Sequence, residues 1–126
     1  MEYTYRRATS RDFESTVQAV RESVPAHGFE LRHVHDLQAT LAAKGFPIQP
    51  LCIFELWLAD EAVTRSRPGR LLMPCRLHVF VEEDAVCVAV IRPTLSALMF
   101  PEVDFDGLDG RLEAAMVDIV DVCTAA

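Results

Sequence analysis

The sequence predicts an α+β fold in two layers: a mostly antiparallel sheet of about five strands, with the first and last helices packed on one face. Five short segments are rich in β-branched and aromatic residues and are bounded by turn-forming residues, which is typical of strands. Two longer segments repeat apolar residues at helical spacing. A chain of 126 residues is long enough to bury one core, so we expect residues 1–126 to form a single domain.

The first two elements are expected to be a short strand and a helix. Tyr3 and Tyr5 alternate with polar residues, as in a half-buried strand. The helix is expected to begin in the segment Thr9-Ser10-Arg11-Asp12, which is close to a capping box but has Asp in place of the usual Glu. Pro25 and Gly28 are expected to end it. Its predicted apolar stripe consists of Phe13, Val17, Val20 and Val24.

Two further strands with a short helix between them are expected next. Residues 29–34 have the composition of a strand, and Asp36 after them is a suitable cap for a short helix. Gly45 is expected to stop that helix, because glycine adopts the left-handed conformation that ends many helices. Residues 51–58 are predicted to form the third strand.

The central part of the chain is expected to contain a β-hairpin. A short helix at 60–65 and a turn at Pro68-Gly69 are predicted before it. Residues 75–82 and 86–91 are both strand-like and are joined through Glu83-Asp84, so they should pair in antiparallel fashion.

The last part of the chain is expected to end in a long helix. Pro93 should end the fifth strand, residues 95–100 are compatible with a helical turn or with irregular structure, and residues 101–107 are predicted to be a loop because acidic residues and helix breakers dominate there. The closing helix has one apolar face at helical spacing. That face consists of Leu108, Leu112, Met116, Ile119, Val120 and Cys123.

The third and fifth predicted strands are apolar on both sides. In residues 51–58 the only charged residue is Glu55, and residues 86–91 carry no charge. Strands of this kind are usually covered on both faces, whereas the two amphipathic helices suffice for about one. Burial of the second face against another copy of the chain predicts a homodimer. Alternatively, the short helices and residues 95–100 cover that face, and the protein is a monomer with a small apolar pocket.

Charge and composition exclude several classes of function. The formal net charge of −7 disfavours nucleic acid binding, and no apolar run reaches the roughly 18 residues that a membrane span needs. The first residues show no secretory signal, which predicts a cytoplasmic location. In that compartment cysteines stay reduced. The four widely spaced cysteines, expected to be free thiols, are Cys52, Cys75, Cys87 and Cys123.

The segment Met73-Pro74-Cys75-Arg76 is the strongest candidate for a functional site. It places a thiol and a cation where a strand begins. Arg76 could lower the pKa of the Cys75 thiol if the two groups approach, but adjacent strand residues point to opposite faces. Cys75 is therefore either a reactive thiol or a buried core residue. His78 shares the strand side of Arg76, and together they offer a polar rim beside an apolar floor.

Three other polar residues have more than one interpretation. His33 and His35 project from one side of a strand and could contribute to a transition-metal site, but two histidines do not make one, and we expect no metal. Glu55 is expected to pair with an arginine or histidine if it faces inward, or else to lie outward near a strand end. The common nucleotide, nucleophile and zinc-protease motifs are absent, and no cofactor is expected.

Several of these residues occur in an order that resembles a known family. They are Phe13, Gly28-Phe29, Asp36, Gly45-Phe46, Glu55, Pro74-Cys75-Arg76 and Pro93. The order resembles the bacterial and archaeal family called domain of unknown function 302, with Pro-Cys-Arg before the hairpin as the most specific element. The resemblance implies a compact, usually homodimeric α+β fold with no established activity. The chain has Trp57-Leu58-Ala59 where members of the family tend to have Cys-Asn-Pro.

Together these observations predict a non-enzymatic cytoplasmic homodimer that binds a small, partly apolar ligand near the Cys75 strand entrance. Cys75, Arg76, His78 and Glu55 are the expected ligand-binding residues. One alternative is redox or persulfide chemistry at Cys75, which requires a depressed thiol pKa and solvent access. Another is a structural module whose apolar face docks a different protein.

Overall fold

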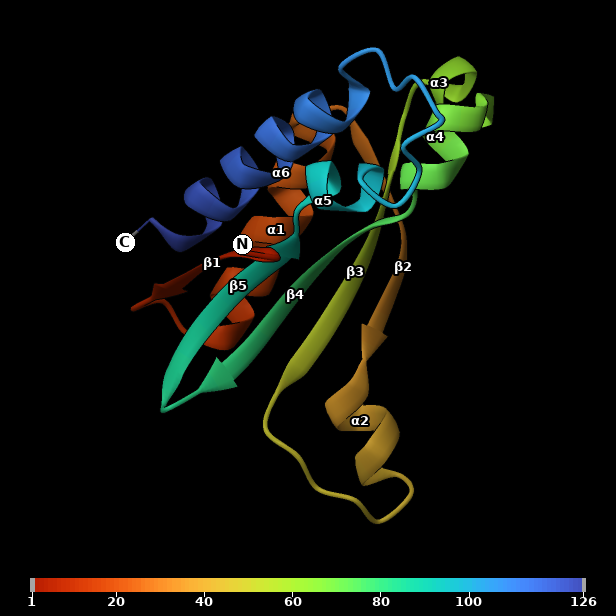
Figure 1. Cartoon of the computed structure of the whole chain (residues 1–126). Coiled ribbons are helices and arrows are strands. Elements are labelled where there is room, and N and C mark those ends of the chain that lie inside the picture. The colour runs from red at the N-terminus through yellow and green to blue at the C-terminus, as the bar shows by residue number, and fades with distance from the viewer. Residues whose placement is uncertain (1, 126) are drawn as a thin grey trace.

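The computed structural model describes residues 2–125 and confirms the predicted two-layer α+β fold (Figure 1). The elements in chain order are β1 (Thr4–Thr9), α1 (Phe13–Ala26), β2 (Phe29–Asp36), α2 (Leu37–Ala42), β3 (Leu51–Leu58), α3 (Glu61–Arg65), α4 (Arg67–Leu72), β4 (Cys75–Glu82), β5 (Ala85–Ile91), α5 (Pro93–Ala97) and α6 (Leu108–Thr124). The five strands form one antiparallel sheet in the order β1-β5-β4-β3-β2.

The first helix begins later than the sequence suggested. Thr9 is the last residue of β1 and pairs with Val86 of β5, so it cannot also start a helix. Asp12 is the N-cap of α1 instead, because its carboxylate accepts a hydrogen bond from the backbone N–H of Ser15 at 2.7 Å. The helix ends just before Gly28, which has a φ of 83° as predicted for a helix terminus.

Pro68, expected in a turn, and Pro93, which follows the end of the fifth strand as expected, both lie in the first turn of a helix. Pro68 and Gly69 lie in α4 rather than in a turn, and Ser66 caps that helix by accepting a hydrogen bond from the Gly69 N–H at 3.0 Å. Pro93 is the first residue of α5. Proline is favoured in the first helical turn, because the N–H that it lacks would have no partner inside the helix there.

The hairpin of β4 and β5 is confirmed. Its strands pair from Leu77 with Val90 to Glu82 with Ala85. Glu83 and Asp84 form the turn with φ angles of 52° and 63°, the left-handed backbone that two-residue hairpins require.

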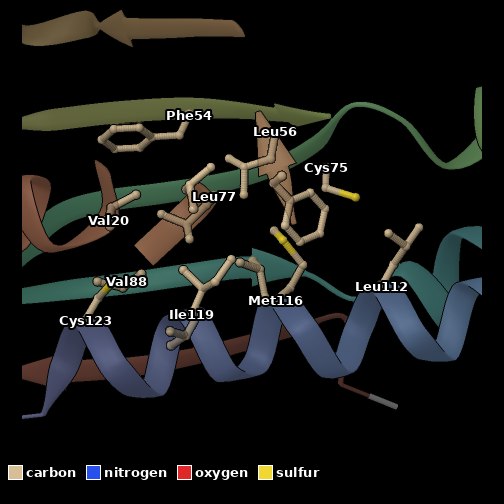
Figure 2. Packing of buried hydrophobic residues seen from close by; sticks show 14 of the residues in the cluster. Val20, Phe54, Leu56, Cys75, Leu77, Val88, Leu112, Met116, Ile119 and Cys123 are labelled. Carbon is tan, nitrogen blue, oxygen red and sulfur yellow. The ribbon is translucent and has the colours of Figure 1, made fainter. Parts of the chain in front are cut away.

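The core lies between the sheet and the helices α1 and α6. All six residues predicted for the buried face of α6 are buried. Figure 2 shows Leu112, Met116 and Ile119 of α6 directed at the side chains of β3 and β4. Phe54, Leu56 and Leu77 contribute that side of the core and are inaccessible to solvent. Cys75 lies on the same side of the sheet.

The other face of the sheet carries no helix among the described residues. Near one end of the sheet α3 contacts α4, and α4 and α5 contact each other and α6, whereas α2 lies at the opposite end (Figure 1). We call this uncovered side the open face. By strand alternation and register, it consists of Thr4, Arg6, Ala8, Glu30, Arg32, His33, His35, Leu51, Ile53, Glu55, Trp57, Arg76, His78, Phe80, Glu82, Ala85, Cys87, Ala89 and Ile91. Over residues 2–125, no helix has both the length and the apolar character needed to cross a membrane.

Candidate functional site

Two rows of side chains cross the middle of the open face. In the first row the strand register places His33 opposite Glu55 and Glu55 opposite Arg76. In the second row His35 faces Ile53, and Ile53 faces His78. The sheet therefore brings three of the four predicted site residues together, namely Glu55, Arg76 and His78, and adds the two histidines of β2 to them.

A β-bulge in β2 puts the two histidines on the open face. In a regular strand Leu31 and His33 would point to the same side. The register shifts between them, so Leu31 pairs with Leu56 on the covered side while His33 pairs with Glu55 on the open side. The rings of His33 and His35 stack with their centroids 6.0 Å apart, as expected for two imidazoles on one side of a strand. Arg32, the extra residue, lies over the Trp57 ring at 4.8 Å.

Glu55 faces outward, on the open face, and it has a histidine partner there, although a partner was expected only for an inward position. His35 Nε2 and Glu55 Oε2 are 2.5 Å apart, a short hydrogen bond. This bond lowers the pKa of Glu55, and the charges of His35, Arg76 and His33 lower it further, against a smaller effect of burial that raises it. Glu55 is therefore ionised at neutral pH.

His78 is held in its neutral form. Burial lowers the pKa of the imidazole, and the nearby positive charge of Arg76 lowers it again. The side chain is half-buried although no helix covers it. At neutral pH His78 therefore offers one N–H donor and one acceptor nitrogen to whatever lies on the open face.

Arg6 of β1 belongs to this surface as well, which the sequence did not indicate. Its guanidinium lies 5.3 Å from the centre of the Phe80 ring and 3.4 Å from a carboxylate oxygen of Glu82. It also donates a hydrogen bond to Cys87 Sγ at 3.5 Å. The pairing of β1 with β5 produces these contacts, and no local pattern in the sequence encodes that pairing.

A small pocket lies at the strand entrance, where β4 begins and β5 ends. Its volume is about 140 Å³, and its walls are Leu72, Pro74, Cys75, Arg76, Ile91, Pro93 and Ser96. Arg76 and Ile91 belong to the open face, whereas Leu72 and Cys75 belong to the core. The pocket therefore lies at one end of the sheet, between the open face and the core. Cys75 and Arg76 point to opposite faces, but both line it.

The Cys75 thiol is buried and uncharged. Its side chain donates a weak hydrogen bond to the Leu72 carbonyl oxygen at 3.6 Å. Burial raises the pKa of the thiol to about 12. Because the thiolate and not the thiol is the nucleophile, this environment favours the interpretation of Cys75 as a core residue.

We predict that Cys75 of the folded protein resists alkylation. With a pKa of about 12, fewer than roughly one thiol in ten thousand is ionised at pH 7.5. Iodoacetamide should therefore label Cys75 at least about a hundredfold more slowly than it labels an unperturbed thiol. Peptide mass spectrometry after timed labelling measures this rate. Protein unfolded in urea is the control, in which all four cysteines should react alike. Labelling of Cys75 within minutes in the folded protein would restore the thiol hypothesis.

A second, larger hollow runs between α1 and the strands β2 and β3. Its volume is about 780 Å³. Val17, Val34 and Cys52 provide apolar lining, and charged side chains of both signs surround them, among them Arg21 and Asp36. The residues come from four separate elements, so no sequence motif marks this groove.

Across the described part of the chain, no three side chains of His, Cys, Asp or Glu converge into a group that could hold a metal ion. His33 and His35 stack beside the single carboxylate of Glu55, which is itself engaged by His35.

Comparison with known proteins gives one family and one fold. A family model described as "Domain of unknown function DUF302" matches residues 5–122, in agreement with the resemblance found in the sequence. The structure is similar to the crystal structure of an uncharacterised conserved protein, DUF302, from Bacillus stearothermophilus, with a TM-score of 0.87 and 21% sequence identity. The similarity covers 98% of this chain and 99% of that chain. None of the curated proteins matches this chain.

Proposed function

The chain belongs to the DUF302 family, and we propose that it is a non-enzymatic cytoplasmic domain that works as a homodimer and binds a small, partly apolar ligand at the strand entrance. In this proposal the open faces of two copies pack together. The pocket beside Cys75 and Arg76 takes the ligand.

The composition of the open face is the observation that supports a homodimer. Ile53, Trp57 and Phe80 lie on it half-buried, although no described helix covers them. Complete burial of such a side chain stabilises a protein by about 1.5–3 kcal/mol relative to full exposure, and these half-buried side chains forgo part of that. Burial against a second copy would recover it.

Charge supports the pairing of two identical open faces. The face carries three arginines, Arg6, Arg32 and Arg76, and three glutamates, Glu30, Glu55 and Glu82. Its formal charge is therefore zero when the histidines are neutral, whereas the whole chain carries −7. Two copies repel each other least when they meet through this neutral surface.

The pocket suits a small molecule with one anionic or polar end. Its volume of about 140 Å³ is close to that of a protein cavity of about 150 Å³ that binds benzene. Leu72, Pro74 and Ile91 offer apolar contacts, while Arg76 and Ser96 offer hydrogen-bond donors at the rim. Because the Cys75 thiol stays neutral, the pocket has no evident nucleophile, which favours binding over catalysis.

We predict that benzoate, used as a probe of matching size and charge, binds at the strand entrance. In a heteronuclear NMR titration, the amide signals of Cys75 and Ser96 should shift in a saturable way at millimolar benzoate. Arg76→Gln should weaken binding about fivefold, because it removes a partly solvated ion pair worth roughly 1 kcal/mol.

Arg70→Gln is the matched control, because Arg70 is an exposed arginine of the adjacent helix α4 that does not line the pocket. It should leave benzoate binding unchanged. The ligand proposal fails if no pocket signal shifts up to tens of millimolar benzoate, or if Arg70→Gln weakens binding as much as Arg76→Gln does. It also fails if native mass spectrometry of protein purified from its source repeatedly shows no bound molecule.

The oligomeric state tests the other half of the proposal. Sedimentation velocity at pH 7.5 should show a concentration-dependent dimer. A chain that stays monomeric and captures a different protein through the open face would instead support the alternative of a heterologous docking module.

A further inference from the structure

Three of the four histidines of the chain lie near the middle of the open face. They are His33 and His35 on β2 and His78 on β4. The fourth, His27, follows α1 and hydrogen-bonds to Ser23 through both the hydroxyl and the backbone carbonyl oxygen. Histidine is the side chain whose ordinary pKa, about 6.5, lies closest to physiological pH. These three side chains are therefore the groups through which the charge of the open face responds most readily to acidification.

The other charged groups of the face come from four strands. They are Arg6 from β1, Glu30 and Arg32 from β2, Glu55 from β3, and Arg76 and Glu82 from β4. The strand β5 contributes Ala85, Cys87, Ala89 and Ile91, none of which carries a charged side-chain group of Asp, Glu, Lys, Arg or His. With neutral imidazoles the six permanent charges cancel. With protonated imidazoles the formal charge of each face becomes +3.

The three carboxylates have little capacity to offset these new charges. Glu82 lies 3.4 Å from Arg6, and Glu30 lies 3.4 Å from Arg32. Glu55 is hydrogen-bonded to His35, so it offsets a positive charge on that imidazole. Arg76, in contrast, has no carboxylate oxygen within 4.0 Å among residues 2–125. Arg76 lies opposite Glu55 in the row that begins with His33, and it is two residues from His78 along β4. New positive charge at His33 and His78 therefore arises next to a cation that is already unpaired.

From this arrangement we infer that the homodimer is acid-sensitive: two copies joined through their open faces separate when His33 and His78 take up protons. This inference rests on the proposed function, because it applies only if the open face is the contact surface. On acidification His33 and His78 add two positive charges near Arg76 on each face, so four such charges meet in the contact between two copies. Repulsion and the loss of solvation both oppose that contact.

The direction in which the dimer dissociation constant changes with pH follows from the pKa values of the histidines in the contact. Burial in a dimer adds desolvation to the effect that already lowers the pKa of His78 in the single chain. A group whose pKa is lower in the dimer than in the monomer stabilises the dimer above the pKa of the monomer, and this contribution is lost as the pH falls. The dimer dissociation constant should therefore be flat above about pH 7 and rise below it.

The expected change is opposite to the one that net charge alone predicts. The isoelectric point of the chain is about 5.0, so acidification brings its net charge towards zero and weakens the general repulsion between copies. A dimer without titrating groups in its interface should thus become tighter as the pH falls. Dissociation on mild acidification is specific to the histidines of the open face.

Sedimentation velocity at pH 7.5 and pH 5.5 tests the inference on the full chain. If the contact excludes protons from only two imidazoles of each dimer, the dissociation constant of the wild type still rises about tenfold or more between pH 7.5 and pH 5.5. Far-UV circular dichroism must stay unchanged, so that dissociation is separated from unfolding. The double variant H33Q/H78Q should change its dissociation constant less than about threefold over the same interval. H27Q, which alters the histidine outside the face, should behave like the wild type.

The possible outcomes separate this inference from the proposed function. A chain that is monomeric at pH 7.5 overturns the homodimer itself. A dimer with equal or tighter association at pH 5.5 leaves the homodimer intact and overturns only the acid sensitivity. Equal loss of affinity in the wild type and in H33Q/H78Q overturns it as well, as does dissociation that occurs only together with the loss of helical signal.

Discussion

Replacing Phe54 with alanine is expected to lower the free energy of unfolding by about 3–5 kcal/mol, the range for truncating a fully buried phenylalanine. Phe54 is inaccessible to solvent and lies opposite Leu77 of β4 and Val34 of β2. Figure 2 shows its ring on the helix side of the sheet. A typical domain is stable by about 5–15 kcal/mol, so this one change removes a large share. Urea unfolding followed by circular dichroism measures it.

Phe80→Ala is the matched control, because it removes the same side chain from the opposite face of the sheet. Phe80 is only half-buried, and the guanidinium of Arg6 lies over its ring. At a protein concentration low enough to keep the open face in water, its loss should cost less than about 1.5 kcal/mol. Equal destabilisation by Phe54→Ala and Phe80→Ala would contradict our assignment of the core to one face of the sheet.

The sequence predicts the covered side of this fold well, because its signals are local. Leu108, Leu112 and Met116 recur at the helical repeat, so one face of the last helix must be apolar wherever the helix packs. The hairpin is equally local, because Glu83 and Asp84 separate two strands by two residues. In both cases the residues that determine the structure lie within one or two turns of the chain.

Prolines and the β-bulge show where local signals become ambiguous. A proline such as Pro68 or Pro93 is compatible both with a β-turn and with the first residues of a helix. For Pro68 the helix is identified by the hydrogen bond that the Ser66 side chain accepts from the Gly69 N–H. Strict alternation would put Leu31 and His33 on one side of β2. The extra residue Arg32 separates them, and nothing in the sequence around it distinguishes a bulge from a regular strand.

The candidate site was only partly predictable, because it depends on register between distant strands. Alternation assigns Arg76 and His78 to one side of β4, but it does not place Arg76 opposite Glu55, 21 positions earlier in the chain. The strand-entrance pocket likewise needs Ser96 of α5 beside Cys75 of β4. Such contacts are set by how the whole chain closes around its core, and the same holds for the contact of Arg6 with Phe80.

Ile53→Arg is expected to convert the proposed homodimer into a folded monomer, with the dissociation constant raised about a hundredfold or more. Ile53 lies between His35 and His78 in the second row of the open face, so the substitution places one new cation near the middle of each of two apposed surfaces. A buried, unpaired charge at an interface costs about 2–5 kcal/mol, which corresponds to a factor of 30 or more, and the dimer acquires two such charges. Sedimentation velocity at pH 7.5 measures the change.

The single chain should tolerate this substitution, because Ile53 points away from the core and a long arginine side chain can reach solvent from the open face. Thermal unfolding at low protein concentration checks this. Val122→Arg is the matched control: Val122 is 52% exposed on α6, the helix that covers the other side of the sheet, and the charge change is the same. It should leave the dimer intact. If Val122→Arg separates the subunits and Ile53→Arg does not, the contact between copies runs through the helices, and the open face must have another occupant.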